Sequence, residues 1–153
     1  MTAGLYLSEV CDAIAGITIS GVTVKDRDQI AGSWLSLPNV LYPNPSQDGF
    51  ITGFTMQFDS MLQGANAPMT LNYTLNYRFL GTAIGDLGIF THAYSSIVDK
   101  LVLIVNAILA TPAPYSGRIQ MSLGAVTMGA KEDPAGNVYY GADFALLIEE
   151  LQN

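Results

Sequence analysis

A stretch of strict alternation near the middle of the chain is the feature that most constrains the fold. In MTLNYTLNYRFL, residues 69 to 80, apolar or aromatic residues occupy every second position, and Thr, Asn and Arg fill most of the positions between them. Because successive side chains of a strand point to opposite faces, this period of two predicts a long strand with one apolar and one polar face. The polar face is almost without charge, so it suits contact with another protein surface as well as with water.

The composition is short of charge for a monomeric domain. Of the 153 residues, 50% are hydrophobic and 12% are charged, against roughly 25% charged in an average soluble domain. The length suits a single domain, residues 1 to 153. The surplus apolar surface must therefore be covered by lipid or by other subunits.

Lipid is disfavoured by the most hydrophobic run, LVLIVNAILA at residues 101 to 110. A membrane-spanning helix needs about 20 apolar residues, and proline stops this run at about half that length. The run predicts a buried helix. The amino terminus shows no secretory pattern, and a single cysteine, Cys11, cannot form an internal disulfide. We expect a cytoplasmic product, without a membrane partner, that assembles with other subunits.

The remaining patterns predict the other elements. They are a helix capped by Thr2 and ended by Gly16, a helix at residues 90 to 110, and strands at 21 to 26, 50 to 59, 117 to 131 and 137 to 150. We expect the α+β class: an antiparallel sheet of two hairpins, residues 50 to 80 and 117 to 150, with the central helix and the N-terminal helix packed on one face. The side chains expected to face the central helix are Leu71, Tyr73, Leu75 and Tyr77.

Residues 34 to 49, WLSLPNVLYPNPSQDG, form an apolar arm rich in proline. Its prolines at positions 38, 43 and 45 exclude a helix and a central strand. The arm is too apolar for a solvated linker, so it packs on its own domain or docks on a neighbouring subunit. Our hypothesis is docking. The predicted subunit interface comprises Trp34, Leu37, Leu41, Tyr42, Thr74, Asn76 and Arg78.

The chain shows no residue pattern typical of an enzyme. Its single histidine, His92, is expected on one helix face with Ser96 and Asp99. A hydrolytic triad needs the imidazole between the hydroxyl and the carboxylate, and here the serine lies in the middle. Cys11 has no basic neighbour to activate it, so we interpret it as a buried structural thiol.

Other candidate sites are equally weak. The segment GTAIGDLG, residues 81 to 88, lacks the spacing of a phosphate-binding loop, and Asp26 and Asp28 lack the further ligands of a calcium loop. Glu149 and Glu150 are expected to end the last strand in solvent. Six basic residues against thirteen acidic ones, with a net charge of -7, disfavour nucleic-acid binding. We expect no catalytic residue, no cofactor and no metal.

The layout of the chain points to one known family. Its components are an opening helix leading into GVTVKD, the arm LPNVLYPNP, the paired strands FITGFTMQFD and MTLNYTLNYRFL, one long helix and the closing YYGADFALLIEE. This layout resembles that of the tail-terminator proteins of long-tailed bacteriophages, the minor tail protein U family, over nearly the whole chain.

The resemblance implies a structural virion protein, assembled in the host cytoplasm, that forms a hexameric ring on the head-proximal end of the tail tube. The ring ends tube polymerisation and provides the head-attachment surface. The implied partners are further copies of the chain, the tail-tube protein, the head-tail connector protein, and genomic DNA that passes through without specific binding.

Acidic residues in loops are expected to face the channel of such a ring, namely Asp48, Asp59 and Asp86. Two other virion roles fit the same features, a head-tail adaptor and a tail-tube subunit. An alternative from another class is a carrier of small apolar ligands, bound between the helices and the sheet.

Overall fold

Six strands of one sheet and two helices make up the described part of the chain. The computed structural model describes residues 6–26, 39–43, 51–58, 69–83, 90–112, 118–133 and 136–152. The elements are α1 (Leu7–Ala15), β1 (Thr23–Val24), β2 (Val40–Pro43), β3 (Ile51–Phe58), β4 (Met69–Ala83), α2 (Phe90–Ala110), β5 (Ile119–Glu132) and β6 (Val138–Gln152). The prediction of a mixed fold with a sheet at its centre is confirmed.

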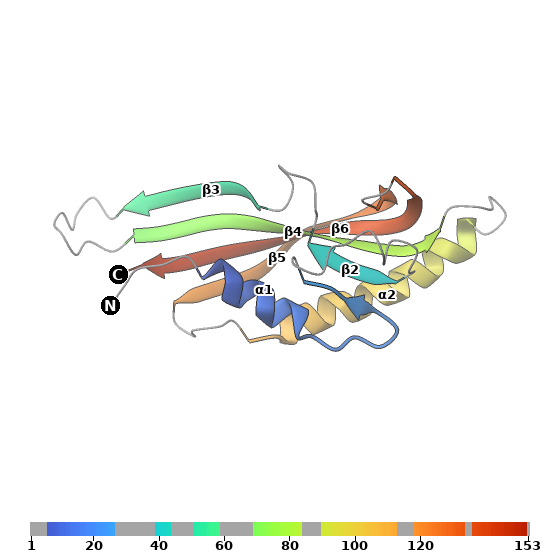
Figure 1. Cartoon of the computed structure of the whole chain (residues 1–153), viewed down its shortest axis with the longest axis horizontal. Coiled ribbons are helices and arrows are strands. Elements are labelled where there is room, and N and C mark those ends of the chain that lie inside the picture. The colour runs from blue at the N-terminus through green and yellow to red at the C-terminus, as the bar shows by residue number, and fades with distance from the viewer. Residues whose placement is uncertain are drawn as a thin grey trace.

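Strand β4 is the centre of the sheet (Figure 1). On one edge it pairs antiparallel with β6 along its whole length, from Met69 opposite Gln152 to Ala83 opposite Tyr139. Its other edge is shared by β3 and β2, which pair antiparallel with its first and second halves. β5 extends the sheet beyond β6, and β1 runs parallel to β2. The sheet therefore contains two short strands besides the four that the hairpin patterns predicted.

Both helices lie on the same side of the sheet (Figure 1). One core joins the two layers: Val10, Cys11 and Ile14 of α1, Ile97, Leu101, Ile104 and Ile108 of α2, and Tyr73, Leu75, Tyr77, Phe79, Phe144 and Leu146 of the sheet. The register predicted for β4 is confirmed for Tyr73, Leu75 and Tyr77, because all three share this core with α2. The Thr and Asn residues between them are only half-buried.

Helix α1 begins later than the sequence predicts. It starts at Leu7 with Tyr6 as its N-cap, so the expected cap by Thr2 is wrong. The backbone N–H of Tyr6 donates to the Glu150 carboxylate, at 3.0 Å to Oε1, and this side chain therefore occupies the place of a local cap. Gly16 follows the last helical residue, as predicted.

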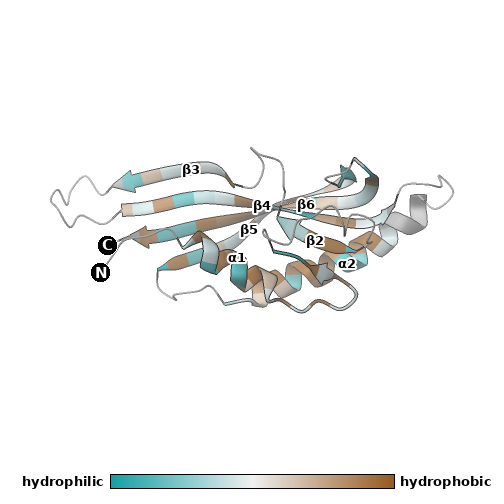
Figure 2. Cartoon of the chain, in the orientation of Figure 1, coloured by the Kyte–Doolittle hydropathy of each residue, from teal (hydrophilic) through white to brown (hydrophobic). Residues whose placement is uncertain are grey.

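Helix α2 is amphipathic, and the prediction that its C-terminal run is a buried helix is wrong. Leu101, Ile104 and Ile108 are buried at helical spacing, whereas Val102 is 53% exposed and Leu109 is 63% exposed. Figure 2 shows hydrophobic residues along much of this helix. A helix covering one face of a sheet buries a single stripe, so the apolar residues outside that stripe remain at the surface.

The arm contains a strand, contrary to prediction. Residues 40–43 form β2 between β1 and β4, and all four are buried. Pro43 is tolerated because it is the last residue of β2, beyond the two positions that pair with β1. Leu41 belongs to the main core, and Tyr42 packs with Val40, Leu80 and Tyr139 on a second cluster. The rest of the arm lies outside the described residues.

Two glycines permit a close approach of β4 and β6. The ladder shifts register between Leu80 and Thr82, so Gly81 forms an irregularity opposite Tyr140. A Cβ on Gly81 would lie 2.9 Å from the backbone oxygen of Tyr140, and one on Gly141 would collide with the backbone oxygen of Phe79. Any larger residue at either position would force the two central strands apart.

The register of β4 gives the first testable prediction. Leu75 is fully buried between the layers, so Leu75→Ala should lower the free energy of unfolding by about 2 to 5 kcal/mol. Thr74→Ala, one residue away on the opposite face, should change it little, because Thr74 is only half-buried. Urea denaturation followed by circular dichroism measures both. Equal losses for the two variants would contradict the observed register.

Candidate functional site

The face of the sheet opposite the helices is polar and poor in charge. On β4 it carries Thr74, Asn76 and Arg78, three of the residues predicted to lie at a subunit interface, and all three are half-buried. The Nδ2 of Asn76 donates to Thr52 Oγ1 on β3 at 3.2 Å, and Asn72 Nδ2 donates to Gln57 Oε1 at 3.3 Å. Neutral side chains therefore join β3 to β4 where charged pairs would be common on a solvated sheet.

A shallow groove of about 560 Å³ lies on this face. Its polar lining includes Asn72, Thr74, Gln120, Ser122 and Glu149. Among the described residues of that lining, Glu149 is the one carboxylate, and the other polar side chains are neutral amides and hydroxyls.

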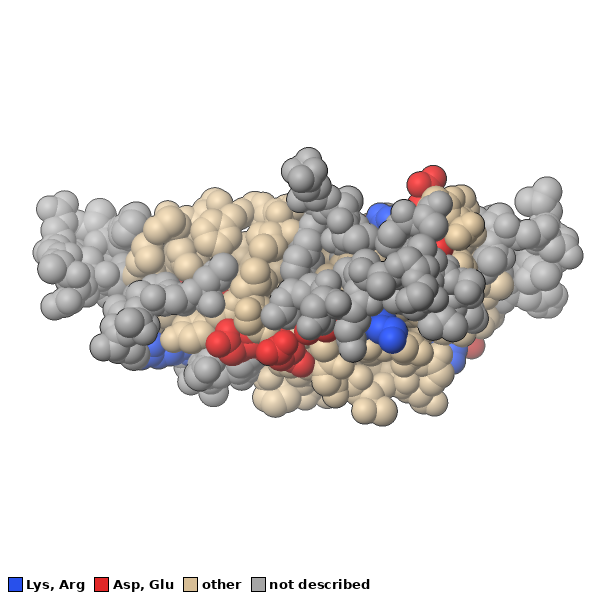
Figure 3. Space-filling model, in the orientation of Figure 1, with Lys and Arg blue, Asp and Glu red and all other residues tan. Residues whose placement is uncertain are grey.

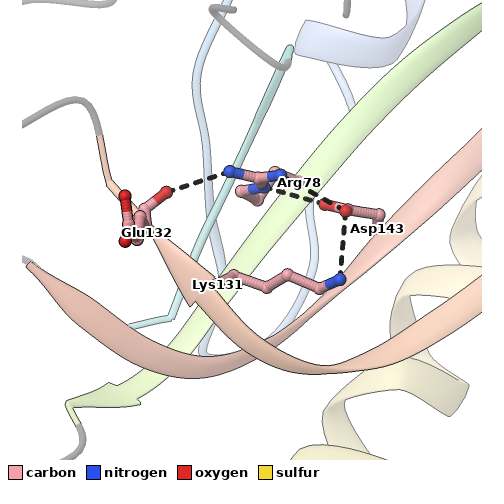
Figure 4. Close-up of polar contacts among 4 residues, drawn as sticks. All are labelled: Arg78, Lys131, Glu132 and Asp143. Atoms are coloured by element: carbon pink, nitrogen blue, oxygen red, sulfur yellow. Dashed lines mark hydrogen bonds and ion pairs between the residues drawn. The ribbon is translucent and has the colours of Figure 1, made fainter. Parts of the chain in front are cut away.

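A charged cluster lies further along the same face, where β4, β5 and β6 meet (Figure 4). Arg78 is directly opposite Asp143 in the ladder, and its Nε donates to Asp143 Oδ1 at 2.8 Å. Lys131 Nζ of β5 lies 3.1 Å from Asp143 Oδ2. Arg78 Nη1 also donates to the backbone oxygen of Glu132 at 3.1 Å. The cluster thus links three strands through one carboxylate.

Opposing effects set the ionisation of this cluster. Partial burial by itself raises the pKa of Asp143, but the hydrogen bonds and charges of Arg78 and Lys131 outweigh it and hold that pKa below its usual value. Arg78 has a raised pKa, first because of its hydrogen bond to Asp143. Burial raises the pKa of the neighbouring Tyr42 to about 12. All three groups therefore keep their ordinary charge at neutral pH, and the cluster acts as a structural tie between strands.

Glu150 corrects a sequence prediction. It was expected in solvent with Glu149; Glu149 is exposed, but Glu150 is fully buried. The hydroxyl of Tyr73 donates to Glu150 Oε1 at 2.5 Å, and the Tyr6 N–H donates to the same oxygen at 3.0 Å. Burial and this hydrogen bond raise the pKa of Tyr73, so its hydroxyl stays protonated. The hydrogen bond from Tyr6 to Glu150 fixes the start of α1 to the end of β6.

Exposed apolar side chains line the helix side of the molecule. Val98 and Val102 of α2 form a groove of about 310 Å³ with Val126 and Met128 of β5. Val98, Val102, Val126 and Met128 are all exposed, although they are large and hydrophobic. Among the described residues visible in Figure 3, few are charged. This surface of α2 and β5 has the character of a protein contact.

Strand β3 carries a second exposed apolar surface. Its residues 51 to 57 are all exposed, including Ile51, Phe54 and Met56. The ring of Phe54 stacks on Tyr73 with centroids 5.5 Å apart, so it lies on the helix side of the sheet. Met56, opposite the buried Leu71 in the ladder, points to the same side. β3 and β5 are on opposite sides of the β4–β6 pair, so the described strands present two separated apolar edges.

The predicted interface residues have mixed outcomes. Leu41 and Tyr42 are completely buried within the single chain, so neither offers surface to a second subunit, and their assignment to a subunit interface is wrong. The physical reason is that Leu41 packs in the main core on one face of the sheet, while Tyr42 packs against Val40, Leu80 and Tyr139 on the other. Trp34, Leu37, Asp48, Asp59 and Asp86 lie outside the described residues, and their proposed roles remain predictions.

The residues considered for catalysis do not form a site where the structure describes them. Ser96 and Asp99 are exposed on α2, and the side chain of His92 lies outside the described part. Cys11 is a free, buried cysteine, which confirms that it is a buried thiol. Within the described ranges, no three His, Cys, Asp or Glu side chains are grouped as metal ligands, and no helix is both long and apolar enough to cross a membrane.

No protein-family model matches the sequence, and no curated protein is significantly similar to it.

The charged cluster gives a prediction of pH dependence. The pKa of Asp143 is lower in the folded protein than in the unfolded chain, where it is about 3.9. Ionised Asp143 therefore contributes fully to the free energy of unfolding above the unfolded pKa. This contribution is lost as the pH falls through the lower folded pKa. Asp143→Asn should lower the free energy of unfolding by about 1 to 3 kcal/mol near neutral pH. The difference from wild type should shrink as the pH falls below the unfolded value and Asp143 becomes protonated in the folded protein.

Chemical denaturation at several pH values measures this difference. The matched control is Glu149→Gln, the same kind of change at an exposed carboxylate of β6, which should leave stability nearly unchanged. A constant difference between Asp143→Asn and wild type at every pH would show that the lost packing, and not the ion pair, causes the effect.

Proposed function

We propose that this chain is a structural subunit of a bacteriophage virion, a tail terminator that forms a ring on the head-proximal end of the tail tube. The ring ends tube polymerisation and provides the head-attachment surface. Its subunit is the two-hairpin sheet with both helices on one face. The observation that carries this proposal is the pair of exposed apolar edges, α2 with β5 on one side and β3 on the other.

Two separated apolar edges suit a ring better than a monomer or a simple dimer. A subunit of a ring contacts two neighbours through two different surfaces. The low charge content, 12% of residues, adds support, because a monomer would leave both apolar edges in water. The layout that resembles tail terminators then supplies the place of the ring, at the end of a phage tail.

A carrier of small apolar ligands has less support. The hollow between the C-terminal part of α2 and the sheet, lined by Ile108, Met121 and Leu146, measures about 50 Å³. Ligand sites are typically about 300 to 1,000 Å³. The side chains of the main core fill this interlayer region. The groove of α2 and β5 reaches about 310 Å³, but its Val98, Val102, Val126 and Met128 are exposed, so it is an open surface that does not enclose a ligand. Both features support an assembly role for the domain.

Two other virion roles remain the runner-up proposal, a head-tail adaptor and a tail-tube subunit. All three roles would use the same apolar edges, so the assembly surface does not separate them. The effect of the protein on the length of tail tubes does. A terminator shortens or caps tubes, a tube subunit polymerises alone, and an adaptor binds the head connector without affecting tubes.

The test is electron microscopy of the purified protein with and without the tail-tube protein of the phage that encodes it. We expect rings from the protein alone, with a mass that is a whole multiple of 16.3 kDa, and capped tubes of limited length in the mixture. Unchanged tube lengths, with no ring at their ends, would refute the terminator role.

The charge balance leads to a separate prediction about DNA. Six chains, each with a net charge of -7, would surround the channel, and tight phosphate binding needs clustered Lys and Arg. We propose that Asp48, Asp59 and Asp86 line the channel and keep the duplex mobile. The isolated ring should not bind duplex DNA at physiological salt in fluorescence anisotropy.

The variant with all three aspartates changed to Asn tests the lining. This variant should form a ring of the same mass as wild type and bind duplex DNA more tightly. Its affinity for DNA should also fall more steeply with salt concentration than that of wild type. Equal affinity for the two proteins would place these carboxylates away from the channel.

A further inference from the structure

We propose that neighbouring copies of this chain join by strand addition: β3 of one copy pairs antiparallel with the free edge of β5 in the next, and Phe54 and Met56 enter the groove between α2 and β5. The occupant of that groove is thus a second copy of the chain. This inference rests on the proposed ring, and it specifies the contact that holds the ring together.

The first argument is the state of the two edges. β3 pairs with β4 on one edge and β5 pairs with β6 on one edge, and none of the described strands covers the opposite edge of either. Free edges usually carry Lys, Pro or other charges that prevent pairing with another chain. Residues 51–58 and 119–130 contain neither a charged residue nor a proline. Within the described part of the chain, both edges are therefore open to strand addition.

The second argument is strand direction. β4 runs antiparallel to β3, β6 to β4, and β5 to β6. Within one copy β3 and β5 therefore run in opposite directions. Copies related by rotation about an axis along the strands keep those directions, so β3 meets the next β5 in antiparallel orientation. The antiparallel pattern of the sheet then continues across the contact.

The third argument is the match of side chains on the helix side. The ladders of β3 and β5 are irregular near Phe54 and near Leu123, which leaves 55–58 and 126–130 as regular stretches without charge. Pairing of these stretches places Met56, which is 52% exposed, beside the groove formed by α2 and β5. Phe54 lies on the same side of the sheet, next to Tyr73. The apolar projection of one edge meets the apolar groove of the other.

Charge favours a second copy as the occupant. Two chains with a net charge of -7 repel each other except where the facing surfaces are neutral. The β3 edge and the α2–β5 groove are both neutral: the groove is lined by five Val and Leu residues of α2 and β5 with Asn106 and Met128. Pairing β3 with β3, or β5 with β5, would leave the other apolar edge of each copy in water. Head-to-tail pairing covers both edges with one contact and closes into a ring.

The test uses one charged substitution on each side of the contact. Met56→Glu damages the β3 edge and Val102→Glu damages the groove, and both residues are about half exposed, so the fold should survive. Leu103→Glu is the matched control, because it lies on the same helix, is 42% exposed and does not line the groove. Circular dichroism checks the fold, and analytical ultracentrifugation measures the mass.

We expect wild type and Leu103→Glu to form the same oligomer, and each edge variant alone to weaken assembly at least tenfold. A mixture of Met56→Glu and Val102→Glu should form a species of two chains, because the first keeps an intact groove and the second an intact β3. Amide hydrogen exchange should show protection of residues 51–58 and 119–130 in the wild-type oligomer, which both variants lose.

Other outcomes overturn the inference. If only one variant weakens assembly, or if the mixture gives no two-chain species, the contact is not head-to-tail. If rings form without protection of these strands, subunits join elsewhere, while the terminator role still stands. If the edges behave as expected but tube lengths do not change, the contact is correct and the proposed function is wrong.

Discussion

The antiparallel pairing of β4 with β6 is the interaction on which the rest of the fold depends. It is the longest ladder in the sheet, and it gives β2, β3 and β5 an edge to pair with. Its alternation also places Tyr73, Leu75 and Phe144 under the helices. Because a shift by one residue would move every side chain to the other face, burial of these residues holds the ladder in a single register. Gly81 and Gly141 allow the two strands to stay close at the irregularity near the end of the ladder.

The few charges of this sheet are used to fix strands and chain ends in place. Asp143 accepts from Arg78 and contacts Lys131, so one carboxylate ties three strands together on the face opposite the helices. Glu150 is buried on the other face, where Tyr73 and the Tyr6 N–H donate to it. A carboxylate in such a place is tolerated because donors replace the water that it loses. Outside these ties the sheet is mostly neutral, and its edges expose Met56 on one side and Val126 on the other. This distribution connects the fold to the proposed ring, since charge stabilises the interior of the subunit while neutral apolar edges remain free for neighbours.

The sequence predicted correctly those strands and helices whose hydrophobic periodicity is visible within one short segment. The alternation of residues 69 to 80 predicted β4 and the face it buries, and the helical spacing of Ile97, Leu101, Ile104 and Ile108 predicted the inner stripe of α2. Cys11 was correctly interpreted as a buried thiol for the same reason. The start of α1, the strand within the proline-rich arm and the burial of Glu150 were missed, because each depends on a partner distant in sequence. Glu150 lies 144 residues from Tyr6, and no local pattern reports that separation.

The apolar edges formed by β3 and by α2 with β5 were also predicted only in part from the sequence. The sequence by itself determined that apolar residues exceed what one domain covers, because that excess follows from composition alone. The sequence analysis assigned part of the subunit interface to Leu41 and Tyr42, two residues of β2 that the fold buries completely. Only the tertiary structure decided which apolar residues stay outside, since exposure depends on which strand lies at an edge and which helix face meets the sheet. The order of the strands left β3 and β5 at opposite edges, and the packing of α2 left Val98 and Val102 beside β5.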